Sequence, residues 1–143
     1  MADDATAAGP RQGGCACGAV RFSVDVTGTE MDACHCGRCR KWSGGPFMAV
    51  EVQNLSVAPE APLGVWDSSE WGERLFCREC GSSLGFRMKD GPMVVLSAFV
   101  FDTPLTQPLV TEIFIDDKPD TYAFAGDTKK MTGAEVMAAF GGE

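Results

Sequence analysis

The stretch "ACHCGRCRKWSGGPF" (Ala33–Phe47) places three cysteines within six positions, Cys34, Cys36 and Cys39. In an extended segment residues i and i+2 point to the same face, so Cys34 and Cys36 can bind one ion. The C-x-x-C spacing that follows lets the chain turn back within three residues, and both of its sulfurs can then reach that ion. A closed structural zinc site needs four protein ligands, and this stretch supplies three.

The other four cysteines of the chain occur as a C-x-C pair and a C-x-x-C pair: Cys15, Cys17, Cys77 and Cys80. The simplest division joins these two pairs into a closed site that ties the start of the chain to its middle. Gly81 follows the second pair directly and suits the tight backbone of a zinc knuckle. In the alternative division, Cys34 and Cys36 join the second pair, and Cys39 and the first pair hold no metal.

His35 is the obvious candidate for a fourth ligand of the three-cysteine site, because the chain has only one histidine. If Cys34 and Cys36 face the metal from an extended segment, however, His35 faces away from it. This geometry favours a histidine that supports the site from behind through hydrogen bonds. A local helical twist would instead make it a ligand. Asp32 lies on the same strand face as Cys34, but zinc among thiolates seldom recruits a carboxylate.

A three-cysteine site with an open position favours a particular chemistry. Three thiolates around Zn²⁺ leave a formal charge of −1, which weakens the ion as a Lewis acid for water but suits a further soft thiolate. A thiol that binds there loses its proton. The reaction of a thiol with an aldehyde therefore fits this site better than amide hydrolysis does.

Basic and aromatic side chains surround the three cysteines. Arg38 and Lys41, with Arg40 between them, form either a solvated turn or a binding site for the carboxylates of an anionic small molecule. Trp42 and Phe47 either pack in the interior or form the wall of a substrate pocket. We take Arg38, Lys41, Trp42 and Phe47 as the candidate substrate-binding residues.

The remaining sequence is typical of a mainly β protein with antiparallel sheets and short helical pieces. In "AVRFSVDV" apolar and polar residues alternate, which predicts a half-buried strand. Further β-prone runs are "PFMAVEV", "RLFC", "SSLGFRM", "MVVLSAFVF" and "VTEIFID". Helical turns are expected in "GRCRKWS", which Gly44 would stop, and in "TGAEVMAAFGG". In the latter, Thr132 and Glu135 have the spacing of a capping box and Gly141–Gly142 form the stop.

Length and charge narrow the class of protein further. A chain of 143 residues fits one domain, expected over residues 13–143 after a flexible tail at residues 1–12. The net charge of −8 disfavours a nucleic-acid partner, since phosphate binding depends on clustered Lys and Arg. No run has the length of a membrane span, and the first residues do not read as a secretory signal. We therefore expect a cytoplasmic protein, in which cysteines serve metal or redox chemistry rather than disulfides.

Three sequence blocks together resemble a known family. "GGCACGAVRF", "CHCGRCRKWSGGPF" and "FCRECGSSL" are similar, in the same order, to the signature blocks of the glutathione-dependent formaldehyde-activating (GFA) or CENP-V domain family. The resemblance covers residues 13 to 125 approximately. It implies a β-tent fold with two zinc ions per chain. By position, Cys15, Cys17, Cys77 and Cys80 match the structural zinc ligands, and Cys34, Cys36 and Cys39 match the catalytic ones.

The resemblance also implies an activity. The family's named reaction is the formation of S-(hydroxymethyl)glutathione from glutathione and formaldehyde by a carbon–sulfur lyase. The expected partner is thus a small-molecule thiol, glutathione or a similar one, and neither nucleic acid nor membrane. Two alternatives stay open. One is a non-catalytic zinc-binding interaction module on the same scaffold. The other is a redox protein in which Cys34, Cys36 and Cys39 exchange disulfides.

Overall fold

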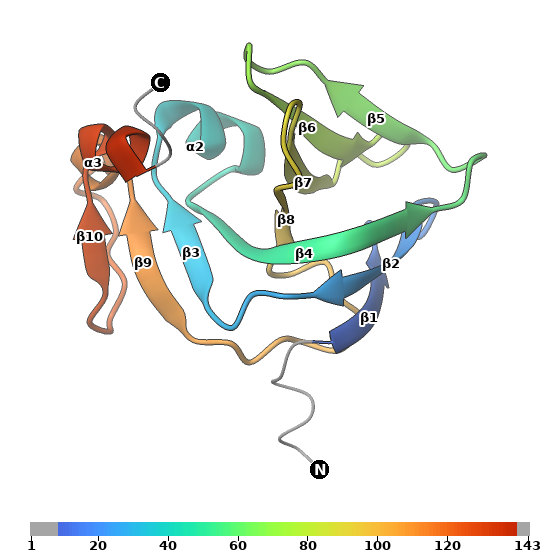
Figure 1. Cartoon of the computed structure of the whole chain (residues 1–143), viewed down its shortest axis with the longest axis horizontal. Coiled ribbons are helices and arrows are strands. Elements are labelled where there is room, and N and C mark those ends of the chain that lie inside the picture. Colours follow the sequence, from blue (N-terminus) through green and yellow to red (C-terminus); the bar gives the residue numbers. More distant parts are fainter. Residues whose placement is uncertain (1–8, 140–143) are drawn as a thin grey trace. The chain divides into compact units, whose positions relative to one another are not determined.

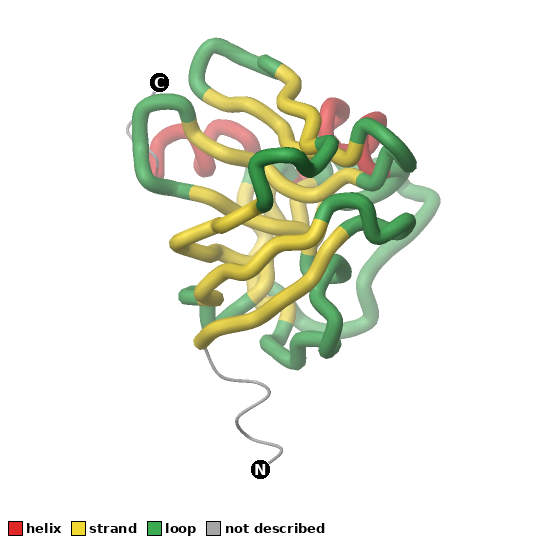
Figure 2. The backbone as a smooth tube through the Cα atoms, turned by 90° about the vertical axis from the view of Figure 1, so that its right-hand side faces the viewer, coloured by secondary structure: helices red, strands yellow, loops and turns green. Residues whose placement is uncertain are grey.

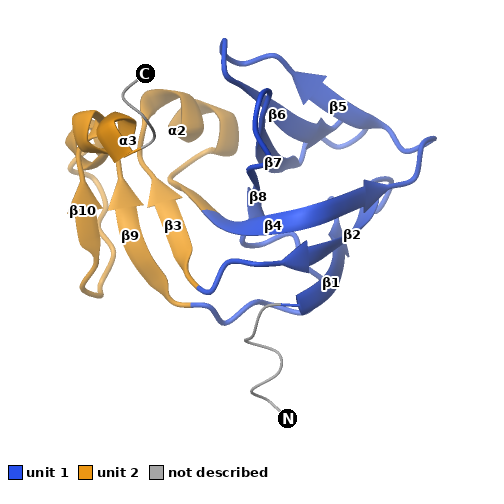
Figure 3. Cartoon of the chain, in the orientation of Figure 1, with its two compact units in different colours: residues 1–29, 49–107 blue, residues 30–48, 108–143 orange. Residues whose placement is uncertain are grey.

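The computed structural model describes residues 9–139, which form a mainly β protein with few helices, as expected. Figure 1 labels its elements, and Figure 2 shows how far strands and loops outweigh the helices. By contact density the chain divides into two compact units, shown in Figure 3. Of the described residues, unit 1 comprises 9–29 and 49–107, and unit 2 comprises 30–48 and 108–139.

Unit 1 is an antiparallel sheet in which β1 pairs with β2, β2 with β4, β4 with β8, β8 with β7, β7 with β6, and β6 with β5. The strands are β1 (Gly9–Gly14), β2 (Arg21–Val26), β4 (Phe47–Val57), β5 (Leu63–Trp66), β6 (Gly72–Cys77), β7 (Ser83–Met88) and β8 (Val94–Ser97), the first two residues of β4 lying in unit 2. The alternation predicted for β2 is present: Phe22, Val24 and Val26 are buried, whereas Arg21 and Ser23 are exposed. With residues of β4 and β8 they form one hydrophobic core.

Strand β1 begins within the segment expected as a tail, residues 1–12. Residues 9–12 belong to this strand and pair with β2, from Gly9 opposite Val26 onward. The sequence "GPRQGG" has no apolar alternation, so its pairing rests on backbone contacts rather than on side-chain burial. A Cβ atom at Gly13 would lie 2.1 Å from the carbonyl oxygen of Val100, so the close approach there requires glycine. Residues 1–8 of the predicted tail lie outside the described residues.

Unit 2 corrects the prediction of antiparallel sheets. Its strands β3 (Met31–Cys34), β9 (Leu109–Ile113) and β10 (Lys129–Met131) pair in parallel, β9 with both of the others. Parallel neighbours need a long connection, and about half of the chain, residues 35–108, separates β3 from β9. The β-prone runs of the sequence show which residues are extended but not which strand lies beside which, so the mixed sheet could not be foreseen.

The described part of unit 2 also contains two short helices and a 3₁₀ turn: α2 (Gly37–Ser43), η1 (Ile115–Asp117) and α3 (Gly133–Ala139). Helix α2 covers the predicted residues, and its C-cap is Gly44, whose φ of 82° is left-handed. The capping box of α3 is confirmed. Glu135 Oε1 accepts from the Thr132 N–H at 2.8 Å, and Thr132 Oγ1 accepts from the Glu135 N–H at 3.2 Å. The predicted stop at Gly141–Gly142 lies outside the described residues.

Candidate metal centres

The sulfurs of Cys15, Cys17, Cys77 and Cys80 converge in unit 1, all within 4.8 Å of one another. Tetrahedral zinc with Zn–S bonds of about 2.3 Å holds its sulfurs about 3.8 Å apart. The separation is 3.6 Å between Cys15 and Cys17 and 3.9 Å between Cys17 and Cys77. This donor set therefore fits a closed zinc site, and we call it the four-cysteine centre.

Local backbone structure builds this centre from two turns. After β1, the Cys15 N–H donates to the Val20 carbonyl, and the Val20 N–H donates to Cys15 Sγ at 3.3 Å. At the end of β6, the N–H groups of Glu79 and Cys80 donate to Cys77 Sγ at 3.3 and 3.4 Å. Such bonds stabilise thiolates, the form that binds metal. The second turn closes at Gly81, whose φ of 80° is left-handed and favours glycine.

The closely spaced sulfurs of the four-cysteine centre have strongly different pKa values. The Ser82 hydroxyl, with backbone N–H groups, lowers the pKa of Cys80 to about 5. The backbone at Ala19 favours a Cys17 thiolate, yet the neighbouring sulfurs, Cys15 foremost, outweigh it and raise the pKa of Cys17 to about 12. Because like charges this close oppose one another, a bound cation is what would allow all four sulfurs to ionise together.

The sulfurs of Cys34, Cys36 and Cys39 form a second cluster in unit 2, also within 4.8 Å of one another. Cys34 ends β3, Cys36 is the N-cap of α2, and Cys39 is buried inside that helix. The Cys39 N–H donates to Cys36 Sγ at 3.3 Å. Hydrogen bonds from Cys34 and Cys39 lower the pKa of Cys36 to about 2, whereas the neighbouring Cys36 and Cys39 raise the pKa of Cys34. We call this cluster the three-cysteine centre.

The two clusters match the simplest division of the cysteines rather than the alternative one. Each cluster offers sulfur ligands for one metal ion, and sulfur ligands are compatible with zinc. Among residues 9–139, neither a histidine nor a carboxylate lies within ligand distance of either cluster. Asp32, the other candidate ligand, is exposed on β3.

His35 lies behind the three-cysteine centre and is completely buried. Its Nε2 bonds to Glu112 Oε1 and its Nδ1 bonds to the Tyr122 hydroxyl, both at 2.8 Å. Both ring nitrogens are therefore already engaged, which agrees with the predicted supporting role and not with metal ligation. The sequence analysis did not identify Glu112 or Tyr122. One signal was available: Glu112 is a charged residue within the apolar run "LVTEIFI".

The predicted substrate-binding residues all lie on or just after α2. Arg38 and Lys41 are exposed and Trp42 is partly buried, whereas Phe47 at the start of β4 is buried. The Trp42 and Phe47 rings pack edge to face with centroids 5.6 Å apart. Arg40, between the two exposed cations, turns inward, and its Nε donates to the His35 carbonyl at 3.0 Å.

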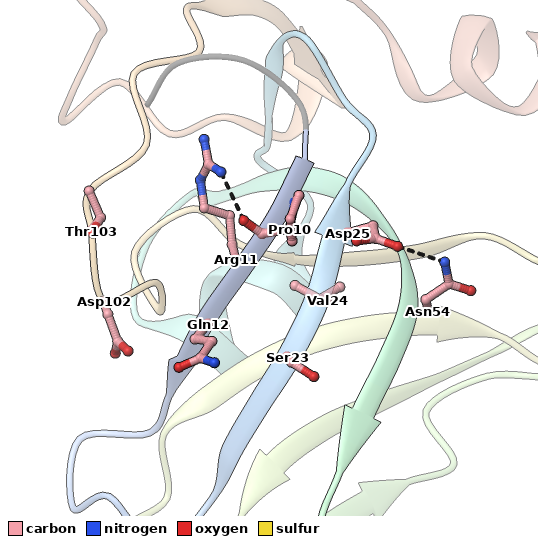
Figure 4. Close-up of a pocket in the computed structure, with 9 residues that line it drawn as sticks. All are labelled: Pro10, Arg11, Gln12, Ser23, Val24, Asp25, Asn54, Asp102 and Thr103. Carbon is pink, nitrogen blue, oxygen red and sulfur yellow. Dashed lines mark hydrogen bonds between the residues drawn. The ribbon is translucent and has the colours of Figure 1, made fainter. Parts of the chain in front are cut away.

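Unit 1 also carries a separate open hollow over β1, β2 and β4, shown in Figure 4. No cysteine lines it. Asp25 accepts from the Asn54 amide at 2.7 Å, and Asp102 pairs with Arg21, which lowers the pKa of that carboxyl. Both carboxylates in the lining of the hollow therefore already have partners, so we do not take the hollow as a candidate active site. Within residues 9–139, moreover, no helix has the length and apolar character that a membrane crossing requires.

Comparison with known proteins points to one family. The model of the family described as glutathione-dependent formaldehyde-activating enzyme matches residues 10–117, which include all seven cysteines. An uncharacterized lyase of Schizosaccharomyces pombe is 35% identical over 128 residues, covering 88% of this chain and 93% of that protein. A protein of Halomonas elongata named putative glutathione-dependent formaldehyde-activating enzyme is 30% identical over 121 residues, covering 76% of this chain and 77% of its own length.

A solved structure shows a similar fold. The crystal structure of a Rhodobacter sphaeroides protein superposes with a TM-score of 0.55 at 20% sequence identity. The match covers 69% of this chain and 99% of that one.

Proposed function

The chain belongs to the glutathione-dependent formaldehyde-activating family, and we propose that it is a zinc-dependent carbon–sulfur lyase of the S-(hydroxymethyl)glutathione synthase type. The observation that carries the proposal is the inequality of the two clusters, four sulfurs in one and three in the other. The structural role falls to the first, and the second leaves one position for a substrate thiol.

In the proposed reaction, the glutathione sulfur forms a bond to the carbon of formaldehyde or of a related small electrophile. The carbonyl π pair moves to oxygen, which gains one proton, while the thiol loses one, so no oxidant or reductant is needed. Cys34, Cys36 and Cys39 would hold the second zinc ion. That ion would supply a bound thiol with a lowered pKa, and hence a sulfur nucleophile at neutral pH.

The protein's own groups would bind and orient the thiol. Arg38 and Lys41 are exposed cations on the helix that carries Cys39, and a guanidinium matches the planar carboxylates of glutathione. Trp42, backed by buried Phe47, would form an apolar wall beside them. Holding thiol and aldehyde together at one place lowers the entropic part of the barrier.

The activity is tested by glutathione-dependent consumption of formaldehyde, measured against the spontaneous rate without protein. We expect the wild-type chain to exceed that rate and Cys36→Ser to return to it, because the variant loses one of three ligands. Lys129→Ala, a change of an exposed cation on β10, serves as the control and should retain the wild-type rate. Equal rates for wild type and Cys36→Ser would reject catalysis at this centre and favour the non-catalytic zinc module.

Three broader expectations belong to the same proposal. We propose that the fold is of the β-tent type, that residues 13–143 behave as one domain, and that the protein is cytoplasmic. The TM-score to a solved structure supports a shared fold without naming its type. A single cooperative unfolding transition, seen alike by circular dichroism and tryptophan fluorescence, would support the one-domain proposal.

A further inference from the structure

A polar network with two buried side chains at its centre lies behind the three-cysteine centre in unit 2. Its centre is the pair His35 and Glu112, whose exposed fractions are 0% and 2%. Tyr122 and Thr128 complete it through hydrogen bonds to this pair. Buried polar groups are costly unless they are fully bonded, so a network of this kind specifies one local arrangement. The reaction proposed above makes no use of it.

The backbone of His35 is held as firmly as its ring. Its N–H donates to the Ile113 carbonyl at 3.1 Å, which continues the pairing of β3 with β9 one residue beyond the strand. Its carbonyl accepts from Arg40 Nε at 3.0 Å. The residue between Cys34 and Cys36 is therefore fixed at four points, two on the backbone and two on the ring.

Glu112 is the anchor of the network. Its Oε1 bonds to His35 Nε2 at 2.8 Å, and its Oε2 accepts from Thr128 Oγ1 at 2.5 Å, with Lys130 Nζ 3.8 Å away. Burial raises the pKa of this carboxyl, but the bonds from Thr128 and His35 outweigh burial and lower it. The acceptor facing the ring is thus a carboxylate, which orients the Nε2–H toward itself and leaves Nδ1 for the Tyr122 hydroxyl.

We propose that Glu112 and Tyr122 are positioning residues of the three-cysteine centre, which clamp the His35 ring and so keep Cys34 and Cys36 convergent before an ion binds. In a closed site, four protein ligands bound to one ion hold one another in position. An open site has one protein ligand fewer, so the surrounding protein must help to hold the remaining ligands in position. The corresponding residue between Cys15 and Cys17 is Ala16, which has no polar side chain. The inference rests on the proposed function only in assigning a metal to this centre.

The test measures metal affinity rather than turnover. The purified chain is loaded with Co²⁺, whose thiolate charge-transfer bands report each centre, and Zn²⁺ affinity is measured by competition with a chromophoric chelator. Cys36→Ser supplies the reference spectrum of the four-cysteine centre alone. We expect Glu112→Gln to weaken the three-cysteine centre by about 10- to 100-fold and to leave the other centre within about twofold. Tyr122→Phe should weaken the same centre by a smaller factor.

Glu51→Gln, an exposed change on β4, is the matched control and should leave both affinities unaltered. Selective weakening of the three-cysteine centre supports the proposal. Unchanged affinities at both centres overturn the proposal. An equal loss at both centres also overturns it, because such a loss indicates a general role in folding.

If Glu112→Gln does not fold, Tyr122→Phe and Thr128→Val provide the same test, since each removes one hydrogen bond and keeps the carboxylate. This test uses no glutathione or formaldehyde. Failure of the catalytic proposal would therefore not affect its result, and failure of this test would not reject the catalytic proposal.

Discussion

In the three-cysteine centre, neighbouring side chains have different roles. In the three-cysteine centre, Cys36 serves at once as helix N-cap and as candidate ligand, and the Cys39 N–H donates to its sulfur. His35, between two candidate ligands, turns away from them into a buried network. One residue step along an extended chain reverses the face of a side chain, so the alternation Cys–His–Cys separates ligands from support.

Arg38 is the side chain whose removal best tests substrate binding. We expect Arg38→Ala to raise the KM for glutathione by about two- to fivefold, the effect of losing one exposed ion pair. Since Arg38 is exposed and is not a ligand, zinc content should not change. Steady-state kinetics with metal analysis on the same samples check both points, and Lys129→Ala is the control. An unaltered KM would show that Arg38 does not contribute to glutathione binding.

At the level of elements, each cluster depends on a different kind of support. The four-cysteine centre ties the turn after β1 to the turn after β6, which lie far apart in the sequence. The three-cysteine centre draws on one short segment, the end of β3 with α2. Figure 1 shows β9 beside β3 and α2 beyond its end. The first cluster closes a long loop, so its metal should contribute more to folding than the second.

Cysteine loss should therefore have unequal consequences. We expect Cys80→Ser to lower the melting temperature by about 10 °C or more, since structural zinc binding contributes folding free energy directly. Cys39→Ser should spare the fold and abolish the glutathione-dependent rate. Thermal unfolding of both variants, beside their activities, makes the comparison. Identical melting curves for the two variants would show that the roles are wrongly assigned.

At the scale of the whole molecule, charge and metal content separate the remaining classes of function. The chain carries 12 basic and 20 acidic residues, a balance that repels a phosphate backbone. Each compact unit holds one of the two clusters. An enzyme or a zinc module of this design needs two metals, whereas a redox protein needs only one and keeps three reactive thiols.

We expect about two zinc ions per fully loaded chain. Brief treatment with a chelator should remove the ion of the three-cysteine centre first, because three protein ligands hold an ion less firmly than four. Elemental analysis before and after treatment, with titration of free thiols, gives the count. A single zinc with three readily titrated thiols would favour the redox alternative.

The sequence alone determined the cysteine division, helix α2 with its glycine stop, the capping box of α3 and the alternating strand β2. These features follow from spacing along a short stretch of chain, where periodicity and local hydrogen bonding decide the structure. The strand at residues 9–12 was not foreseen, because its pairing uses the backbone, which every sequence shares. Only the tertiary structure decided that β3 and β9 run in parallel. That pairing brings Glu112 to His35 across 77 positions of sequence, a proximity that no local pattern encodes.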